Sequence, residues 1–154
     1  MLVWTVILRV LFSKMIDRWI IRIVFGNLPK YMNILIIEHD MSYAQWLKKN
    51  IGVRGYRIEI RSNAQEAQNS LSQKSFHLVL VNIFLPDSTG SLLISKIKTI
   101  SPKVGIIAMT DRNSRELEMQ IRSLDILYYM IKPIDKKYLT HLLDHVEKKS
   151  VSVG

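Results

Sequence analysis

Short apolar runs and stretches of helical periodicity alternate five times along residues 33–148, and this alternation restricts the fold more than any other feature of the sequence. Apolar runs typical of strands lie at residues 34–37, 77–83, 104–109 and 126–131, and the alternation of apolar and charged residues at 56–60 predicts a further strand. Helical spacing follows at 42–53, 92–100, 113–123 and 135–148, with a further helix capped by Asn63. Strands that alternate with helices form a parallel sheet covered on both faces. We therefore predict an α/β fold: a doubly wound, three-layer (βα)5 domain.

The composition excludes several kinds of site. None of the 154 residues is a cysteine, which excludes a disulfide framework, a cysteine nucleophile and a thiolate metal site. There are 22 Lys and Arg residues against 13 Asp and Glu, a net charge of +9. No basic run is longer than two residues and no basic stripe is interleaved with aromatic residues. We interpret the charge as a feature of a soluble surface, and expect a cytoplasmic protein without a nucleic-acid partner.

Residues 1–31 form an apolar, basic segment that differs from the predicted domain at 32–149 and its tail at 150–154. The longest run without a charge, residues 1–8, is too short to span a bilayer. Helical spacing near residues 12–25 predicts an extra N-terminal helix, and Trp and Ile opposite Lys and Arg are typical of a membrane-surface helix. A second interpretation stays open beside this one. Met32 directly precedes the first strand, so residues 1–31 are alternatively upstream sequence translated from a misassigned start.

Polar side chains collect where the predicted strands end. Glu38, His39 and Asp40 follow the first strand and Asn82 ends the third. Later strands end at Thr110 and Asp111, and at Lys132 before Pro133. In an open parallel sheet these ends border one crevice at the switch point. The set is typical of a site that handles phosphate or metal, but it carries little negative charge.

Four stretches at these strand ends, in this order, resemble the receiver domain of two-component response regulators: residues 34–40, 78–90, 106–110 and 128–133. The resemblance spans residues 32–149 and implies a flavodoxin-like receiver fold that acts in phosphorelay signal transduction. It also implies a role for single residues. These are the acidic-pocket positions Glu38 and His39, the phosphoacceptor position Asn82, the metal-contacting carbonyl of Phe84, and the phosphoryl-binding and switch positions Thr110, Tyr129 and Lys132.

Two of these residues depart from the family pattern, because His39 stands where a second acid is expected and Asn82 replaces the phosphoacceptor aspartate. An amide cannot form an acyl phosphate. Mg²⁺ prefers anionic oxygen ligands, and Glu38 is the one carboxylate left of three. We therefore expect no phosphorylation at this site, weak or absent Mg²⁺ binding, no other cofactor and no enzymatic activity. We also expect Asp40 to cap the following helix and Lys132 to pair with Glu38, which would lock the domain in one state.

Some residues keep two interpretations. Thr110 either binds phosphoryl oxygens or caps the following helix region, and Tyr129 is either the switch aromatic or a half-buried strand residue. We expect His39 to be a partly exposed polar residue, because a lone histidine lacks metal co-ligands.

Our leading hypothesis is a pseudo-receiver that acts by protein–protein interaction without phosphorylation. By resemblance, a histidine kinase or an effector would dock on the face of the fourth helix, fifth strand and fifth helix, which contains Arg115, Met119, Tyr129 and Tyr138. The sequence does not decide whether the domain dimerises. One alternative is a working phosphorelay receiver with an unusual acceptor, with His39, Asp40 and Asp111 as candidates. Another is a membrane-surface adaptor anchored through residues 12–25.

Overall fold

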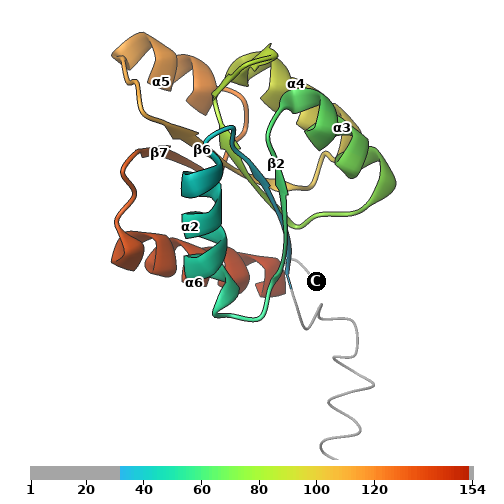
Figure 1. Cartoon of the computed structure of the whole chain (residues 1–154), viewed down its shortest axis with the longest axis vertical. Coiled ribbons are helices and arrows are strands. Elements are labelled where there is room, and N and C mark those ends of the chain that lie inside the picture. Colours follow the sequence, from blue (N-terminus) through green and yellow to red (C-terminus); the bar gives the residue numbers. More distant parts are fainter. Residues whose placement is uncertain (1–31, 153–154) are drawn as a thin grey trace, which may run out of the picture. The chain divides into compact units, whose positions relative to one another are not determined.

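The computed structural model describes residues 32–152, and these contain one five-stranded parallel sheet (Figure 1). The strand order is β2-β1-β3-β6-β7, so the direction of winding reverses between the neighbours β1 and β3. The strands are β1 (Asn33–Ile37), β2 (Arg57–Arg61), β3 (Leu78–Asn82), β6 (Gly105–Thr110) and β7 (Tyr128–Ile131). The described part of the chain thus confirms the predicted doubly wound α/β architecture.

Five helices accompany the sheet in the described part of the chain: α2 (Met41–Gly52), α3 (Ala64–Gln73), α4 (Gly90–Ile100), α5 (Arg115–Arg122) and α6 (Lys136–Ser152). All five were predicted, with ends that differ by a few residues; α6 continues past the predicted end at residue 148. A short antiparallel hairpin of β4 (Phe84–Leu85) and β5 (Ser88–Thr89) was not predicted. Strands of two residues are too short to produce a recognisable hydrophobic period.

The two faces of the sheet carry separate hydrophobic clusters. Helices α2 and α6 pack on one face, where Leu47 and Leu142 lie in the same cluster as Leu80. Helices α3, α4 and α5 pack on the other, where Leu71, Leu93 and Ile121 surround alternate strand residues (Figure 1). The central strand β3 is buried at all five residues, as expected of a strand covered on both sides.

Polar side chains fix the starts of three helices near the carboxyl edge of the sheet. Asp40, Asn63 and Ser114 each accept a hydrogen bond from a backbone N–H in the first turn of α2, α3 and α5 respectively. The first turn of α3 receives further acceptors from the β4–β5 turn. There the two carboxylate oxygens of Asp87 accept from the N–H groups of Ala64 and Gln65 at 2.9 and 3.0 Å.

Helix α4 approaches the end of β3 so closely that it requires glycine at its first residue. A Cβ atom added to Gly90 would lie 2.3 Å from Cβ of Ile83 and 2.6 Å from its Cα. The N–H of Gly90 donates to the carbonyl of Ile83 at 2.8 Å, which holds the two backbones together. Gly90 therefore fixes the loop that follows Asn82.

The predicted N-terminal helix and the segment 1–31 lie outside the described residues. Within residues 32–152, no helix combines the length and the apolar character needed to cross a membrane.

Candidate functional site

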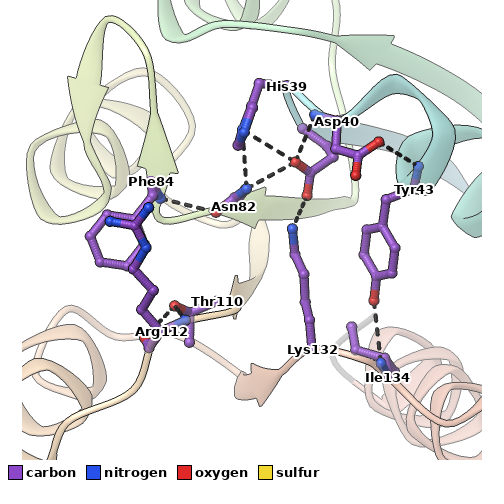
Figure 2. Close-up of polar contacts among 10 residues, drawn as sticks. His39, Asp40, Tyr43, Asn82, Phe84, Thr110, Arg112, Lys132 and Ile134 are labelled. Carbon is purple, nitrogen blue, oxygen red and sulfur yellow. Dashed lines mark hydrogen bonds and ion pairs between the residues drawn. The ribbon is translucent and has the colours of Figure 1, made fainter.

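A polar crevice lies at the carboxyl edge of the sheet, beside the switch point between β1 and β3. Glu38 directly follows β1 and Asn82 is the last residue of β3, and both are almost completely buried. Lys132 follows the edge strand β7, and its side chain extends toward Asn82 and the end of β1 (Figure 2). The structure therefore brings together three residues that the sequence analysis had placed at one crevice.

The carboxylate of Glu38 is the centre of this crevice, because side chains from two other strand ends bond to it. Its Oε1 accepts a hydrogen bond from the side-chain amide of Asn82 at 2.9 Å and one from the backbone N–H of Asp40 at 3.0 Å. Its Oε2 accepts from the ammonium group of Lys132 at 2.5 Å. Because both oxygens have protein donors, the buried charge is compensated without any bound cation.

Asn82 is held at both ends of its amide. Its Oδ1 accepts from the backbone N–H of Phe84 at 3.0 Å, and its Nδ2 lies 3.3 Å from Nδ1 of His39. The His39 side chain is 47% exposed and its Nδ1 lies 3.4 Å from Oε1 of Glu38. These contacts orient the amide with its oxygen toward the β4 loop and its nitrogen toward β1.

Lys132 has an aromatic neighbour that the sequence analysis missed. Its ammonium nitrogen lies 4.6 Å from the ring centroid of Tyr43, a cation–π contact. The Tyr43 hydroxyl accepts from the N–H of Ile134 at 3.3 Å, and the ring stacks on Trp46 with centroids 5.6 Å apart. Burial raises the pKa of Tyr43, and the nearby charge of Glu38 adds to the rise. The sequence analysis had placed Tyr43 only within the helical spacing of residues 42–53.

Thr110 is buried, but its hydroxyl is bonded within its own loop. It donates to the carbonyl of Arg112 at 2.5 Å and accepts from the N–H of the same residue at 3.0 Å. In the described part of the chain this hydroxyl makes no hydrogen bond to Asn82 or Lys132, although the backbone carbonyl of Thr110 accepts from the N–H of Lys132 at 2.7 Å. The guanidinium of Arg112 lies 5.3 Å from the ring centroid of Phe84 and so reaches from the β6–α5 loop to the β4 loop (Figure 2).

Tyr129 lies in the hydrophobic cluster that α5 covers, and it is 7% exposed. It is therefore more buried than the sequence analysis expected if Tyr129 were an ordinary strand residue. Its hydroxyl donates to the side-chain oxygen of Asn113 at 2.8 Å, and the guanidinium of Arg122 lies 5.6 Å from the ring centroid. Burial raises the pKa of Tyr129, with a further contribution from the charge of Glu118. Asn113 was not singled out from the sequence, because only the folded loop shows where its side chain points.

The residues of the crevice do not form a binding set suited to Mg²⁺. Among the described residues, no three His, Asp or Glu side chains converge closely enough to hold a metal ion. Glu38 is the single buried carboxylate within residues 32–148, and the neighbouring His39 offers an imidazole nitrogen, which Mg²⁺ disfavours. The carboxylate of Asp40 is directed to the start of α2, where it accepts from Tyr43 N–H at 3.1 Å.

A separate hollow of about 300 Å³ lies between α5, β7 and α6. Tyr129, Ile131 and Tyr138 are among the residues that line it. Ile131 and Tyr138 are about half exposed, and Met119 on α5 is 63% exposed. Apolar side chains therefore gather on the face that contains the edge strand of the sheet.

The strand order and the crevice at the switch point define a flavodoxin-like α/β domain. A family model described as the response regulator receiver domain matches residues 34–144, so the chain belongs to this family. It is therefore a receiver domain of two-component signalling.

Known proteins agree with this assignment. The chain is 29% identical over 104 residues to the transcriptional regulatory protein ZraR of Klebsiella oxytoca, covering 68% of this chain and 24% of ZraR. It is 32% identical over 124 residues to the transcriptional regulatory protein CitT of Bacillus subtilis (strain 168), covering 78% of this chain and 54% of CitT. The chain thus spans about a quarter to about half of these relatives.

Solved structures show the same fold. A CheY-like response regulator receiver domain protein from Methanospirillum hungatei JF-1 matches with a TM-score of 0.76 and 25% identity, over 80% of this chain and 99% of that one. A two-component response regulator from Clostridium difficile matches with a TM-score of 0.74 and 25% identity, over 77% and 98% of the two chains.

Proposed function

We propose that this receiver domain acts in signalling by binding a partner, without phosphorylation at residue 82. The observation that carries the proposal is the pairing of Asn82 with Glu38 at 2.9 Å, at the crevice where the family resemblance places the phosphoacceptor. The side chain of Asn82 is an amide, which is not a nucleophile toward a phosphoryl donor.

The second support is the charge of the crevice. Transfer of a phosphoryl group to a carboxylate needs a cation to offset the negative charge that gathers there. The two charged groups that meet here, Glu38 and Lys132, neutralise each other. A divalent cation would have to displace Lys132 from the carboxylate in order to bind, so we propose that Mg²⁺ binds weakly or not at all.

The third support is that the loops around the crevice are bonded among themselves. Lys132 joins β7 to β1 through Glu38, Arg112 lies against Phe84, and Tyr129 is bonded to Asn113. These contacts favour one conformation of the loops, so that the α5–β7–α6 face keeps one shape. A phosphoryl group would have no free partner to recruit in Thr110, whose hydroxyl is already bonded to Arg112.

The proposed partner is a signalling protein, a histidine kinase or an effector, that docks on the α5–β7–α6 face in the cytoplasm. Met119, Ile131 and Tyr138 supply exposed apolar surface there, beside the hollow of about 300 Å³. In protein–protein interfaces, a few apolar and aromatic residues that pack into pockets contribute most of the binding energy. On this proposal the domain is not an enzyme.

The proposal is tested with beryllofluoride, which mimics a phosphoryl group bound to aspartate. Backbone amide NMR spectra of the natural chain are recorded with Mg²⁺, before and after beryllofluoride is added, beside those of Asn82→Asp. We expect unchanged spectra for the natural chain, and shifts around β3, β6 and β7 in the variant. Shifts around this crevice in the natural chain would overturn the proposal.

A further inference from the structure

The corner at which α2 turns into β2 carries a group of exposed cations with no ion pair among the described residues. Lys48 and Lys49 lie in the last turns of α2, and Arg57 begins β2. All three side chains are exposed. On the neighbouring helix α6, the ion pairs of Asp144 and Glu147 within the described residues are with Arg54, at 2.7 and 3.5 Å. We call Lys48, Lys49, Val53 and Arg57 the α2–β2 corner.

The same corner exposes an apolar side chain. Val53 is 80% exposed, the highest value among the exposed large hydrophobic residues of the described chain. It stands at the tip of the turn, which Gly55 closes with a φ of 77°. Beside it, Tyr56 and Ile58 help line a shallow hollow of about 590 Å³, bordered by Lys48 and Lys49. Val53 is therefore exposed next to two lysines and beside a hollow that Tyr56 and Ile58 help to line.

The α2–β2 corner lies at the end of the sheet away from the crevice. Arg57 lies opposite Asn33 in the β1–β2 register, and its N–H donates to the carbonyl of Met32 at 3.0 Å. The corner is therefore at the end of the sheet where β1 and β2 begin, opposite the carboxyl edge that holds the crevice. Docking through the corner would leave the crevice exposed to solvent.

We propose that the α2–β2 corner docks on an anionic lipid surface, with Val53 directed into the interface and Lys48, Lys49 and Arg57 at the lipid phosphates. Cations near an anionic membrane are attracted by its surface potential, while an apolar side chain gains from leaving water at the headgroup boundary. A nucleic-acid surface would use the cations alone and would leave Val53 exposed. This inference is independent of the phosphorylation state of the crevice.

The test is sedimentation of the purified full chain with vesicles of phosphatidylcholine, with and without phosphatidylglycerol, at low and high salt. We expect binding to the anionic vesicles only, weakened by salt. The double variant Lys48→Glu, Lys49→Glu should lower the partition coefficient about tenfold or more. The matched control Lys136→Glu, Lys137→Glu makes the same change of charge at the opposite edge of the sheet and should bind nearly as the natural chain does.

A second variant tests the apolar contact. Val53→Asn, which removes the apolar contact without adding a charge, should lower the partition coefficient, whereas the control Leu92→Asn, the same kind of change at an exposed side chain of α4, should not. Circular dichroism and thermal unfolding verify that each variant is folded. The inference is overturned if the natural chain does not bind anionic vesicles, if it binds neutral vesicles equally, or if both lysine pairs reduce binding to the same extent. Binding to duplex DNA that is lost in Lys48→Glu, Lys49→Glu, without any vesicle binding, would assign the corner to nucleic acid instead.

Discussion

The ammonium group of Lys132 lies 2.5 Å from Oε2 of Glu38, although the two residues are 94 positions apart in the chain. The Glu38 side chain has no exposed area and that of Lys132 is 12% exposed. This ion pair links the carboxyl ends of β1 and β7. The ammonium group bonds to the carboxylate that a metal ion in the crevice would need as a ligand.

Removing one member of this pair should destabilise the fold strongly. Lys132→Ala leaves a buried carboxylate without its cation, and we expect a loss of about 3 kcal/mol in the free energy of unfolding, measured by urea denaturation. The matched control is the double variant Glu38→Gln, Lys132→Met, which removes both charges at similar volume and should cost much less. A loss below about 1 kcal/mol for Lys132→Ala would show that water readily replaces the ammonium group.

Asp87 should make the stability depend on acid pH. Hydrogen bonds from the N–H groups of Ala64 and Gln65 lower the pKa of Asp87 from its ordinary value of 3.8. Its contribution is therefore complete above about pH 3.8 and is lost as the pH falls toward the lower pKa of the folded state. Because the side chain is exposed to solvent, its contribution is small, and we expect Asp87→Asn to lower the free energy of unfolding by about 1 kcal/mol at neutral pH.

The difference between the natural chain and Asp87→Asn should shrink when urea denaturation is repeated below about pH 3.8. The control Asp111→Asn removes an exposed carboxylate with no hydrogen-bond partner in the described part of the chain, and should change stability little at either pH. A difference for Asp87→Asn that stays constant with pH would contradict the capping role.

The hydrogen bond between Tyr129 and Asn113 should couple β7 to the β6–α5 loop. Tyr129→Phe and Asn113→Ala are each expected to cost about 1 kcal/mol, since each removes one partly buried hydrogen bond. In a double-mutant cycle the combined variant should lose less than the sum of the two single variants. Strict additivity would mean that the bond does not form in solution.

Gly90 should tolerate no side chain. Because an added Cβ would lie 2.3 Å from Cβ of Ile83, we expect Gly90→Ala to lose about 3 kcal/mol of stability through overpacking. Gly52→Ala is the control, since the nearest atom to its added Cβ is 3.8 Å away, and should be neutral or slightly stabilising. Thermal unfolding of both variants compares the positions directly, and equal melting temperatures would contradict the close approach of α4 to β3.

Much of the fold was predictable because its strands are long enough to produce clear apolar runs and its helices carry polar caps in sequence. Asp40, for example, was expected to cap α2, and it does. The expected pairing of Lys132 with Glu38 is also present, because strand ends of a parallel sheet meet at one edge. Both inferences needed only residue type and order along the chain.

Other contacts depend on side-chain directions that no sequence period encodes. Tyr43 lies on the α2 face that packs against the sheet, yet its ring covers Lys132. Thr110 could be placed at a strand end, but only the folded loop shows that its hydroxyl is bonded to Arg112. The contact between Asp87 and the start of α3 joins segments more than twenty residues apart through a turn that was not recognised as a hairpin.

The central claim is that residue 82 accepts no phosphoryl group. Its most direct test is intact-mass measurement of the full chain after incubation with acetyl phosphate and Mg²⁺, beside Asn82→Asp. We predict no added mass on the natural chain and the mass of one phosphoryl group on the variant, whose new carboxylate would lie between Glu38 and the N–H of Phe84. A phosphoryl group on the natural chain would contradict the claim, and peptide mapping would then identify another acceptor.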